Sequence, residues 1–357
     1  MAIYNIIYIL TLLGIFFGFS RKSRLINVCY IAASAIIILS VALRAEGIGA
    51  DTYNYLEHFK NPSNPANYYY GKVEAGYLGF VYLIKFISDN KYFFLFLTAL
   101  LPYTAILYFG KKYATNTMLF LFLLLSFSIG ASLYILSFSM VRQVMAIGIW
   151  AIVLHLYISN GYRFNKYVVI AIILMVSFHT SSLLGLILLG LDKVHLSKKV
   201  MIICCAFAYC AGLLMGTIFP YIQNIALLIG GEFYLTSRIG DFAFNPFALL
   251  PYMGIFFLIL AYNSTEYCNS IFVKGLLLSI IVSGILYSIG TNLDRINMYF
   301  YLPAFIAVAD IFRKPKPFIK YMVLAAFLIY FSYKYYFAIE ATYIPLAPLV
   351  PYRSFLS

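Results

Sequence analysis

Several charged side chains in this sequence could do chemistry, because they stand beside long apolar segments in which a charge is costly. The stretch Arg44–Phe59 (RAEGIGADTYNYLEHF) follows such a segment and carries an arginine, three acids, a histidine and two glycines. Asp51 is a candidate general base, with an ion pair to Arg44 or Arg142 as the structural alternative. Arg44 and Tyr53 are candidate substrate-binding residues, unless the stretch is an ordinary solvated loop with interfacial tyrosines.

Three further arginines stand near polar residues at the mouths of apolar segments: Arg142, Arg238 and Arg295. A guanidinium is a planar fork of donors that suits phosphate and pyrophosphate. At a membrane edge it could hold a lipid-linked pyrophosphate while the lipid tail stays in the bilayer. For any single arginine the alternative is a side chain that only anchors the helix at the interface. The neighbouring polar residues that we include as candidate substrate-binding residues are Gln143, Asp241, Asn292 and Tyr299.

His179 is a second candidate general base, because it stands in a polar cluster inside the apolar segment 166–191. This segment either breaks at the cluster into two half-length helices, or continues as one helix around a hydrogen-bonded histidine. We interpret His155 as a core histidine, and His58 and His195 as solvated loop residues. The chain has no HExxH, Asp-x-Asp, GxGxxG, Walker or GxSxG motif, which argues against a nucleotide-driven or metal-dependent reaction.

The composition indicates which elements must position these residues. The chain has 357 residues, of which 64% are hydrophobic and only 10% charged, and its mean hydropathy is +0.91. A water-soluble domain does not have this balance, so we predict an all-α polytopic membrane bundle that forms a single integral domain over residues 1–357. The net charge of +13 comes mainly from short loops beside apolar segments and does not indicate nucleic-acid binding. The five cysteines lack metal-ligand spacing, and we interpret them as buried thiols.

The positive-inside rule orients the predicted helices. The basic loop 21–24 belongs inside, which places the N-terminus and Arg44 outside. Glu74–Ile87 is apolar but short, and we predict that it does not cross fully, because crossing would move the basic loops 111–112 and 163–166 outside. The inner side then holds fifteen Lys and Arg against three acids, and the outer side ten against nine. We expect about 11–13 spanning or half-spanning helices, among them 3–19, 25–43, 91–109, 117–136, 140–158, 200–219, 247–262, 271–289, 296–312 and 318–337, with outer loops 44–90 and 220–246 and an outer tail 340–357 contributing to the site.

Five short motifs recur in an order that resembles a known family. They are Arg44 with Gly49–Phe59, SMVRQVMAIGIW at Ser139–Trp150, VSFHTSSLLGL at Val176–Leu186, LDRINMYFYLP at Leu293–Pro303, and YIPLAPLVPY at Tyr343–Tyr352. Together they resemble the EpsG family of Wzy-type polysaccharide (O-antigen) polymerases, and the likeness runs across nearly the whole chain.

This resemblance implies a GT-C-like glycosyltransferase of the bacterial inner membrane with a site that faces the periplasm. Such an enzyme moves a growing glycan from undecaprenyl pyrophosphate onto the non-reducing-end sugar of another lipid-linked repeat unit. Arg142, Arg295 and Arg44 would contact pyrophosphate and glycan, and His179 or Asp51 would assist the acceptor hydroxyl. Pyrophosphate leaves readily when arginines stabilise it, so no metal, nucleotide or other cofactor is expected. The implied partners are the lipid-linked donor and acceptor, membrane lipids and a chain-length regulator protein.

Three other functions fit parts of the same pattern. A ligase would hand the polymer to a different acceptor, but ligases often carry a larger outer loop late in the chain than 220–246. A flippase for the lipid-linked unit would favour a cation-lined cavity through the middle of the membrane, whereas the polar groups here gather on one side. A scaffold without a catalytic site is the third alternative, and isolated membrane charges argue against it.

Overall fold

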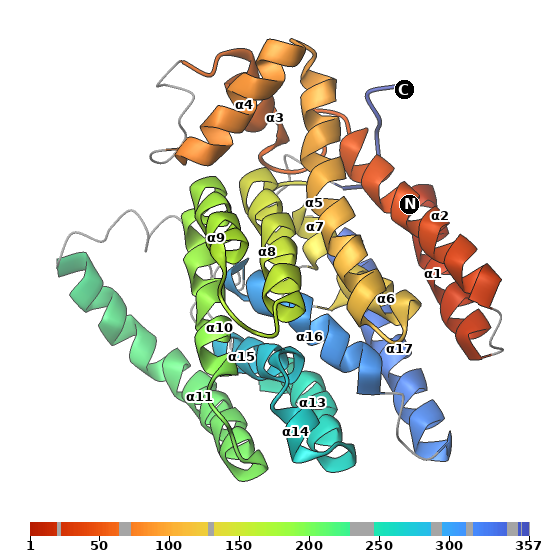
Figure 1. Ribbon diagram of the computed structural model, residues 1–357, viewed down its shortest axis with the longest axis vertical. Helices are drawn as coiled ribbons and strands as arrows, with labels where there is room; N and C mark the ends of the chain where they lie inside the picture. The colour runs from red at the N-terminus through yellow and green to blue at the C-terminus, as the bar shows by residue number, and fades with distance from the viewer. Residues whose placement is uncertain are drawn as a thin grey trace. The chain divides into compact units, whose positions relative to one another are not determined.

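The computed structural model describes residues 1–19, 23–63, 73–127, 132–228, 246–286, 295–311, 317–340, 349–350 and 352–356 (Figure 1). Within these ranges the chain is built from helices, and its only pairing of strand type is one isolated antiparallel bridge between Arg44 and Ser354. Four helices are long and apolar enough to cross a membrane: Arg24–Ala42, Lys91–Tyr113, Val141–Ser159 and Tyr321–Glu340. Several shorter apolar helices accompany them. The predicted all-α polytopic membrane fold is confirmed.

The chain divides into two compact units. The first comprises residues 1–127, 131–183 and 325–357, and the second comprises 128–130 and 184–324. That both act as one membrane domain stays a prediction. The first unit contains α1 (Ala2–Phe19), α2 (Ser23–Ala42), α3 (Thr52–Lys60), α4 (Ala75–Ile87), α5 (Lys91–Tyr113), α6 (Thr117–Ser126), α7 (Leu133–Leu136), α8 (Val141–Ser159), α9 (Lys166–Phe178) and most of η2 (Thr180–Gly185) and α17 (Pro317–Glu340). The second contains α10 (Leu186–Asp192), α11 (Lys198–Leu228), η3 (Pro246–Ala248), α13 (Leu250–Tyr262), α14 (Thr265–Cys268), α15 (Ile271–Leu286) and α16 (Met298–Ile311).

Helix α5 separates two polar ends of the first unit. Lys91 in its first turn forms an ion pair with Glu46, which follows α2. Lys111 in its last turn donates a hydrogen bond to Asn27, near the start of α2. The helix has 23 residues, about 35 Å at 1.5 Å per residue, which is enough to cross the hydrocarbon core of a bilayer. We call the end that holds Lys91 and Glu46 the upper end, as it is drawn in Figure 1.

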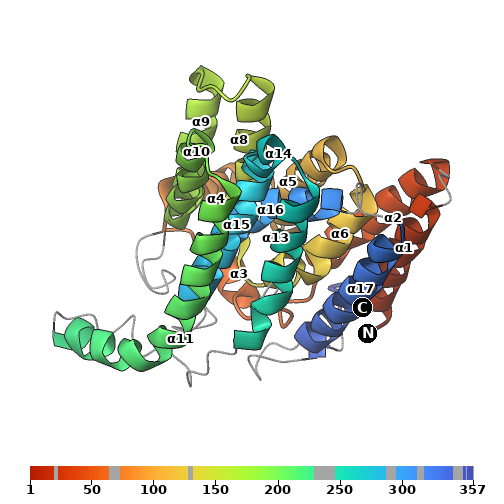
Figure 2. The same ribbon diagram turned by 90° about the horizontal axis from the view of Figure 1, so that it is seen from below.

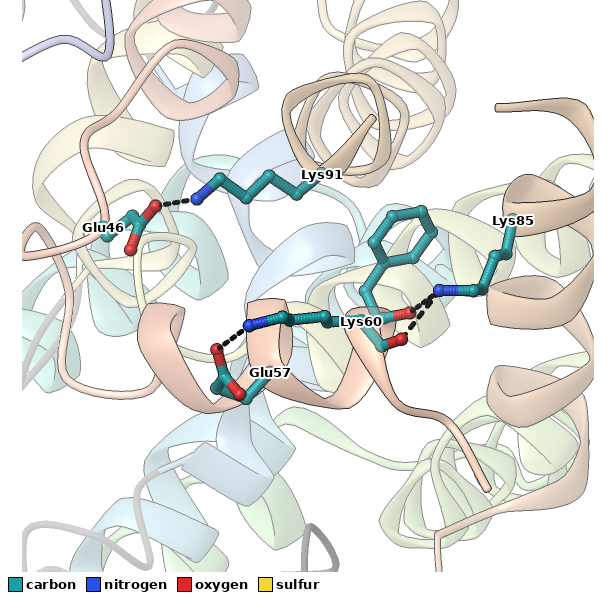
Figure 3. Close-up of polar contacts among 6 residues, drawn as sticks. Glu46, Glu57, Lys60, Lys85 and Lys91 are labelled. Carbon is teal, nitrogen blue, oxygen red and sulfur yellow. Dashed lines mark hydrogen bonds and ion pairs between the residues drawn. The ribbon is translucent and has the colours of Figure 1, made fainter. Parts of the chain in front are cut away.

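Helices α3 and α4 lie together across this upper end (Figure 1). Lys85 on α4 donates hydrogen bonds to the backbone carbonyls of Phe59 and Lys60, at 3.3 and 2.7 Å (Figure 3). These are carbonyls at the end of α3, where a cation is favoured by the helix dipole. The 13 residues of α4 span about 20 Å, too little to cross a bilayer. This length is consistent with a helix that does not cross, and the position of Glu74–Ile87 relative to the membrane stays a prediction.

The loop between α2 and α3 is pinned to the segment that connects α7 with α8. Gly49 has a positive φ of +85°, and an added Cβ there would lie 2.0 Å from the carbonyl oxygen of Phe138. Only glycine permits this turn and this close approach. Next to it, the Ala50 N–H donates to Ser139 Oγ at 3.0 Å, and Thr52 Oγ1 donates to the Phe138 carbonyl at 3.0 Å. The loop thus fixes where α3 begins.

The C-terminal residues pack over the end of α2. The Ala45 N–H donates to the Arg353 carbonyl at 2.9 Å, and the Phe355 N–H donates to the Leu43 carbonyl at 3.1 Å. The ring of Phe355 also stacks on Tyr92, with 3.9 Å between ring centroids. These contacts hold the end of the chain at the upper end of the first unit.

Helices α8 and α9 lie side by side, as Figure 1 and Figure 2 both show. Helix α5 packs on the opposite flank of α8. An added Cβ at Gly148 of α8 would lie 2.4 Å from Cα of Pro102 in α5, so only glycine permits this approach of the two backbones. In the second unit, α15 packs against α16 and α11.

Most helix boundaries lie within a few residues of those predicted, and two differ by more. Helix α6 ends at Ser126, whereas an uninterrupted span was expected over 117–136. Helix α11 continues to Leu228, although an outer loop was expected from residue 220. Residues 222–228 are therefore the last part of α11 and not part of a loop.

Candidate functional site

Three side chains from distant parts of the sequence meet at the upper end of the first unit. Arg142 Nη1 lies 2.5 Å from Glu74 Oε2, and His179 Nδ1 lies 2.8 Å from Glu74 Oε1. The backbone N–H of Thr180 also donates to Glu74 Oε1, at 3.3 Å. The Glu74 side chain is only 10% exposed, while Arg142 and His179 are 28% and 24% exposed. A buried carboxylate is thus shared by two groups that each keep some access to the surroundings.

The ends of three helices deliver these groups. Arg142 stands in the first turn of α8. Helix α9 packs beside α8 and ends near the start of α8, and His179 is the residue that directly follows α9. Glu74 directly precedes α4 and has an extended backbone. Gly76 lets α4 approach α9, because an added Cβ would lie 2.1 Å from Ser177 Oγ. The site therefore forms where α4 crosses the α8–α9 pair.

Of the two alternatives for the segment 166–191, the structure shows the break at His179. Helix α9 ends at Phe178, His179 has an extended backbone, and a six-residue 3₁₀ helix, Thr180–Gly185, follows. The alternative of one continuous helix through this segment is wrong. The extended backbone turns the His179 side chain towards Glu74 and aims the N–H of Thr180 at the same carboxylate.

An aromatic wall from α3 and α4 covers the cluster. Tyr55 meets Tyr77 edge to face at 6.0 Å between ring centroids, and His58 stacks on Tyr77 at 5.7 Å. Tyr55 is electrostatically coupled to Arg142 and hydrogen-bonds with it. The expectation that His58 is solvated is wrong, because its side chain is 4% exposed and packs against this wall. Its position on the inner face of α3 explains the difference.

The electrostatics of the cluster favour an ionised carboxylate. Burial raises the pKa of Glu74, but the hydrogen bond from His179 and the charge of Arg142 outweigh it and lower the pKa to about 2. Burial and the charge of Arg142 lower the pKa of His58. Burial raises the pKa of the Tyr55 hydroxyl. At neutral pH, Glu74 therefore carries a negative charge that balances the charge of Arg142.

Two candidates from the Arg44–Phe59 stretch lie near the start of α3. Asp51 is half-buried at the N-cap position, close enough to Tyr55 to raise the pKa of its hydroxyl. Arg44 is fully buried; its Nε donates to Thr52 Oγ1 at 3.0 Å and its Nη1 to the Val41 carbonyl at 2.5 Å. Burial lowers the pKa of Arg44 to about 10. Its contacts hold the loop and α3 together, and substrate binding by Arg44 stays a prediction.

The other predicted residues are distributed over both units. Tyr53 is 57% exposed on α3, and Gln143 is buried beside Arg142 on α8. Arg295 and Tyr299 belong to the second unit, where Tyr299 is buried in α16. The pairing of Arg295 with Arg142 therefore stays a prediction. Arg238, Asp241 and Asn292 lie outside the described residues.

Glu74 is the residue that the sequence interpretation missed. It was treated only as the first residue of a short apolar segment. The available signal was a carboxylate placed directly before an apolar helix, where a charge must find a partner or water. Arg142 and His179 are these partners, but they lie 68 and 105 residues further along the chain. The sequence alone therefore did not indicate that they meet Glu74.

The fold and this buried charge cluster are those of a multi-pass membrane protein with a polar site at one end of a helical unit. The model of the EpsG family matches residues 27–354, nearly the whole chain. The protein therefore belongs to the EpsG family, and membership supports a membrane glycosyltransferase role of the polymerase-like kind. No curated protein and no solved structure matches the chain.

Proposed function

We propose that the protein is a polysaccharide polymerase that uses lipid-linked repeat units as both donor and acceptor. It transfers the growing glycan from undecaprenyl pyrophosphate onto the non-reducing-end sugar of a second lipid-linked unit. Family membership supports the reaction class. The observation that supports this site most strongly is the meeting of Arg142 and His179 at one buried carboxylate.

The reaction requires two things that this cluster offers. The acceptor hydroxyl must lose a proton, and the partly exposed imidazole of His179 is a suitable base. The departing pyrophosphate must be stabilised as negative charge develops on it, and a guanidinium fork suits that task. Because pyrophosphate is already a good leaving group, we propose that neither a metal ion nor a nucleotide is needed. In the second unit, Arg295 is the proposed contact for the other lipid-linked unit.

The charge balance of the cluster favours catalysis over tight ground-state binding. A general base must be neutral before it acts, and with a neutral imidazole the charges of Glu74 and Arg142 balance each other. When His179 takes the acceptor proton, the cluster gains a positive charge at the moment when the leaving group gains a negative one. An interaction that strengthens in the transition state accelerates the chemical step, whereas uniform binding does not.

We propose that the upper end of the first unit faces the periplasm and that the protein lies in the bacterial inner membrane. The support is the predicted excess of Lys and Arg in the opposite loops. Membrane lipids and a chain-length regulator are the further partners that we propose.

Deletion of the gene in the native host tests this function against its rivals. A cell without the polymerase should still display single repeat units on its surface and lose all longer chains. Complementation with the wild-type gene should restore the ladder of chain lengths. Complete absence of surface repeat units after deletion would instead indicate a flippase, and full-length chains that remain on the lipid carrier would indicate a ligase. Either result would overturn the proposed function.

A further inference from the structure

We propose that Glu74 is a positioning residue that fixes the tautomer of His179, so that Nε2 of the imidazole is the bare nitrogen that takes the proton of the acceptor hydroxyl. This inference rests on the proposed function for the identity of that hydroxyl. The orientation of His179 itself depends only on the contacts of Glu74 and can be measured without substrate.

The first step is the direction of the hydrogen bond between the two side chains. An ionised carboxylate can only accept, so at 2.8 Å from Glu74 Oε1 the Nδ1 atom of His179 must carry a hydrogen. In the neutral ring, Nε2 then has a free lone pair. Among the described residues Nε2 of His179 has no hydrogen-bond partner, and the side chain is 24% exposed. The nitrogen that can act as a base is thus the one left accessible.

The second step is that Glu74 is itself held in place. Its two oxygens receive Arg142 Nη1, His179 Nδ1 and the N–H of Thr180. Because Thr180 is the residue after His179, the carboxylate is fixed by the same backbone turn that carries the imidazole. A histidine held by a carboxylate in this way has its ring orientation and its tautomer set together.

The third step is the chemistry that this orientation allows. The acceptor oxygen forms a bond to the anomeric carbon of the donor sugar, and the bond from that carbon to the pyrophosphate oxygen breaks. Pyrophosphate departs with the electron pair of that bond, and the hydroxyl proton moves to Nε2 of His179. The resulting imidazolium, with both nitrogens protonated, is stabilised by the negative charge of Glu74. No oxidant, reductant or further reactant is required.

The charged and titratable groups around His179 come from three helices. Arg142 faces it from α8 across the shared carboxylate. Tyr55 and His58 face the cluster from α3, and Tyr77 faces it from α4. Asp51 at the start of α3 is a further acid here, and its charge acts on Tyr55. A change in the pH profile that follows a substitution of Glu74 must be compared with the effect of these neighbours.

Nitrogen-15 NMR of histidine-labelled protein in lipid nanodiscs tests the orientation directly. The chain has four histidines, so the signals of His179 are identified as those that disappear in His179→Asn. In the wild-type protein we expect the neutral ring to carry its hydrogen on Nδ1. In Glu74→Gln that preference should weaken, because a glutamine can either accept from Nδ1 or donate to it.

Glu46→Gln is the matched control, because it removes a carboxylate that forms an ion pair with Lys91 at the same end of the unit (Figure 3). The hydrogen bond and ion pair of His179 are made with Glu74 and not with Glu46. It should leave the His179 signals unchanged. A wild-type ring with its hydrogen on Nε2 would overturn the inference, and so would a tautomer that is the same in wild type and Glu74→Gln. The wild-type spectrum decides the first point even if the Glu74 variant folds poorly.

A kinetic measurement separates this inference from the proposed function. General base catalysis typically contributes about 10²–10⁴-fold, so Glu74→Gln should lower kcat by about 10²-fold or more with little change in KM. The pH profile of kcat should shift in this variant and not in Glu46→Gln. Wild-type protein that shows the expected tautomer but forms no glycan bond would refute the proposed function and the base role together. Active wild-type protein with an equally active Glu74→Gln variant would refute only the role of Glu74.

Discussion

Replacement of Glu74 by glutamine should destabilise the protein in a strongly pH-dependent way. The change keeps the size of the side chain and its ability to accept a hydrogen bond, but it removes the negative charge. That charge is held in a site where Glu74 is 10% exposed and contacts Arg142 and His179. The variant therefore isolates the electrostatic part of the cluster.

The expected magnitude follows from the pKa of Glu74, which falls from 4.5 to about 2 in the folded protein. A shift of this size corresponds to about 3 kcal/mol of stability at neutral pH. Because the folded pKa is the lower one, this contribution is present above pH 4.5 and is lost as the pH falls towards 2. At pH 3 the wild-type protein should retain only about half of it. The glutamine variant lacks the contribution at every pH.

Reversible unfolding in mixed micelles measures this difference. The free energies of unfolding of wild type and Glu74→Gln should differ by about 3 kcal/mol at neutral pH and by about half of that at pH 3. Glu46→Gln, which removes a half-exposed ion pair with Lys91, should lower the free energy of unfolding by only about 0–1 kcal/mol. A Glu74 variant as stable as wild type at neutral pH, or a difference that does not shrink at pH 3, would refute the electrostatic account of the cluster.

Three further outcomes are expected. Asp51→Asn should lower turnover more than membrane insertion, as measured by chain-length ladders beside the amount of protein in the membrane; normal polymerisation would assign Asp51 a structural role or none. Gly148→Ala should lower the free energy of unfolding by about 1–3 kcal/mol, because its methyl group would meet the backbone of α5. Gly254→Ala, with open space around its Cβ, should be neutral or slightly stabilising in the same unfolding assay. Equal effects of the two substitutions would contradict the packing of α5 on α8. In a cysteine-free background, Lys91→Cys and Lys111→Cys should react with an impermeant thiol reagent from opposite sides of the membrane, and labelling from one side only would contradict the crossing of α5.

The fold could be predicted from the sequence because apolar composition and loop charge act over whole segments. Long apolar runs identify membrane helices, and the cations at 111–112 and 163–166 indicated that Glu74–Ile87 would not cross. The structure places α4 across one end, in agreement with that reasoning. Individual helix ends were less predictable. The run 117–136 reads as one apolar segment by its average composition, yet α6 ends at Ser126. Ser126, Ser128, Gly130 and Ser132 were the local signal for this stop.

The candidate site could be predicted only in part, because it depends on which charges meet in space. Arg142 and His179 were recognisable as isolated polar residues at helix ends, and the structure brings them to one carboxylate. Glu74 was not recognisable, since its role arises only when α4 crosses α8 and α9. Arg44 shows that the same signal can also mislead. It is a lone arginine at a helix end, but it is fully buried and donates hydrogen bonds to Thr52 and to the α2 backbone.

Incubation of the purified protein with lipid-linked repeat units, followed by gel separation of the products, tests the central claim most directly. Wild-type protein in nanodiscs should produce a ladder of chain lengths and release undecaprenyl pyrophosphate. Arg142→Ala should produce no ladder while remaining in the membrane, and Arg142→Lys should restore little, because it keeps the charge but loses the planar fork. A wild-type ladder from Arg142→Ala would contradict a polymerase site built around this arginine.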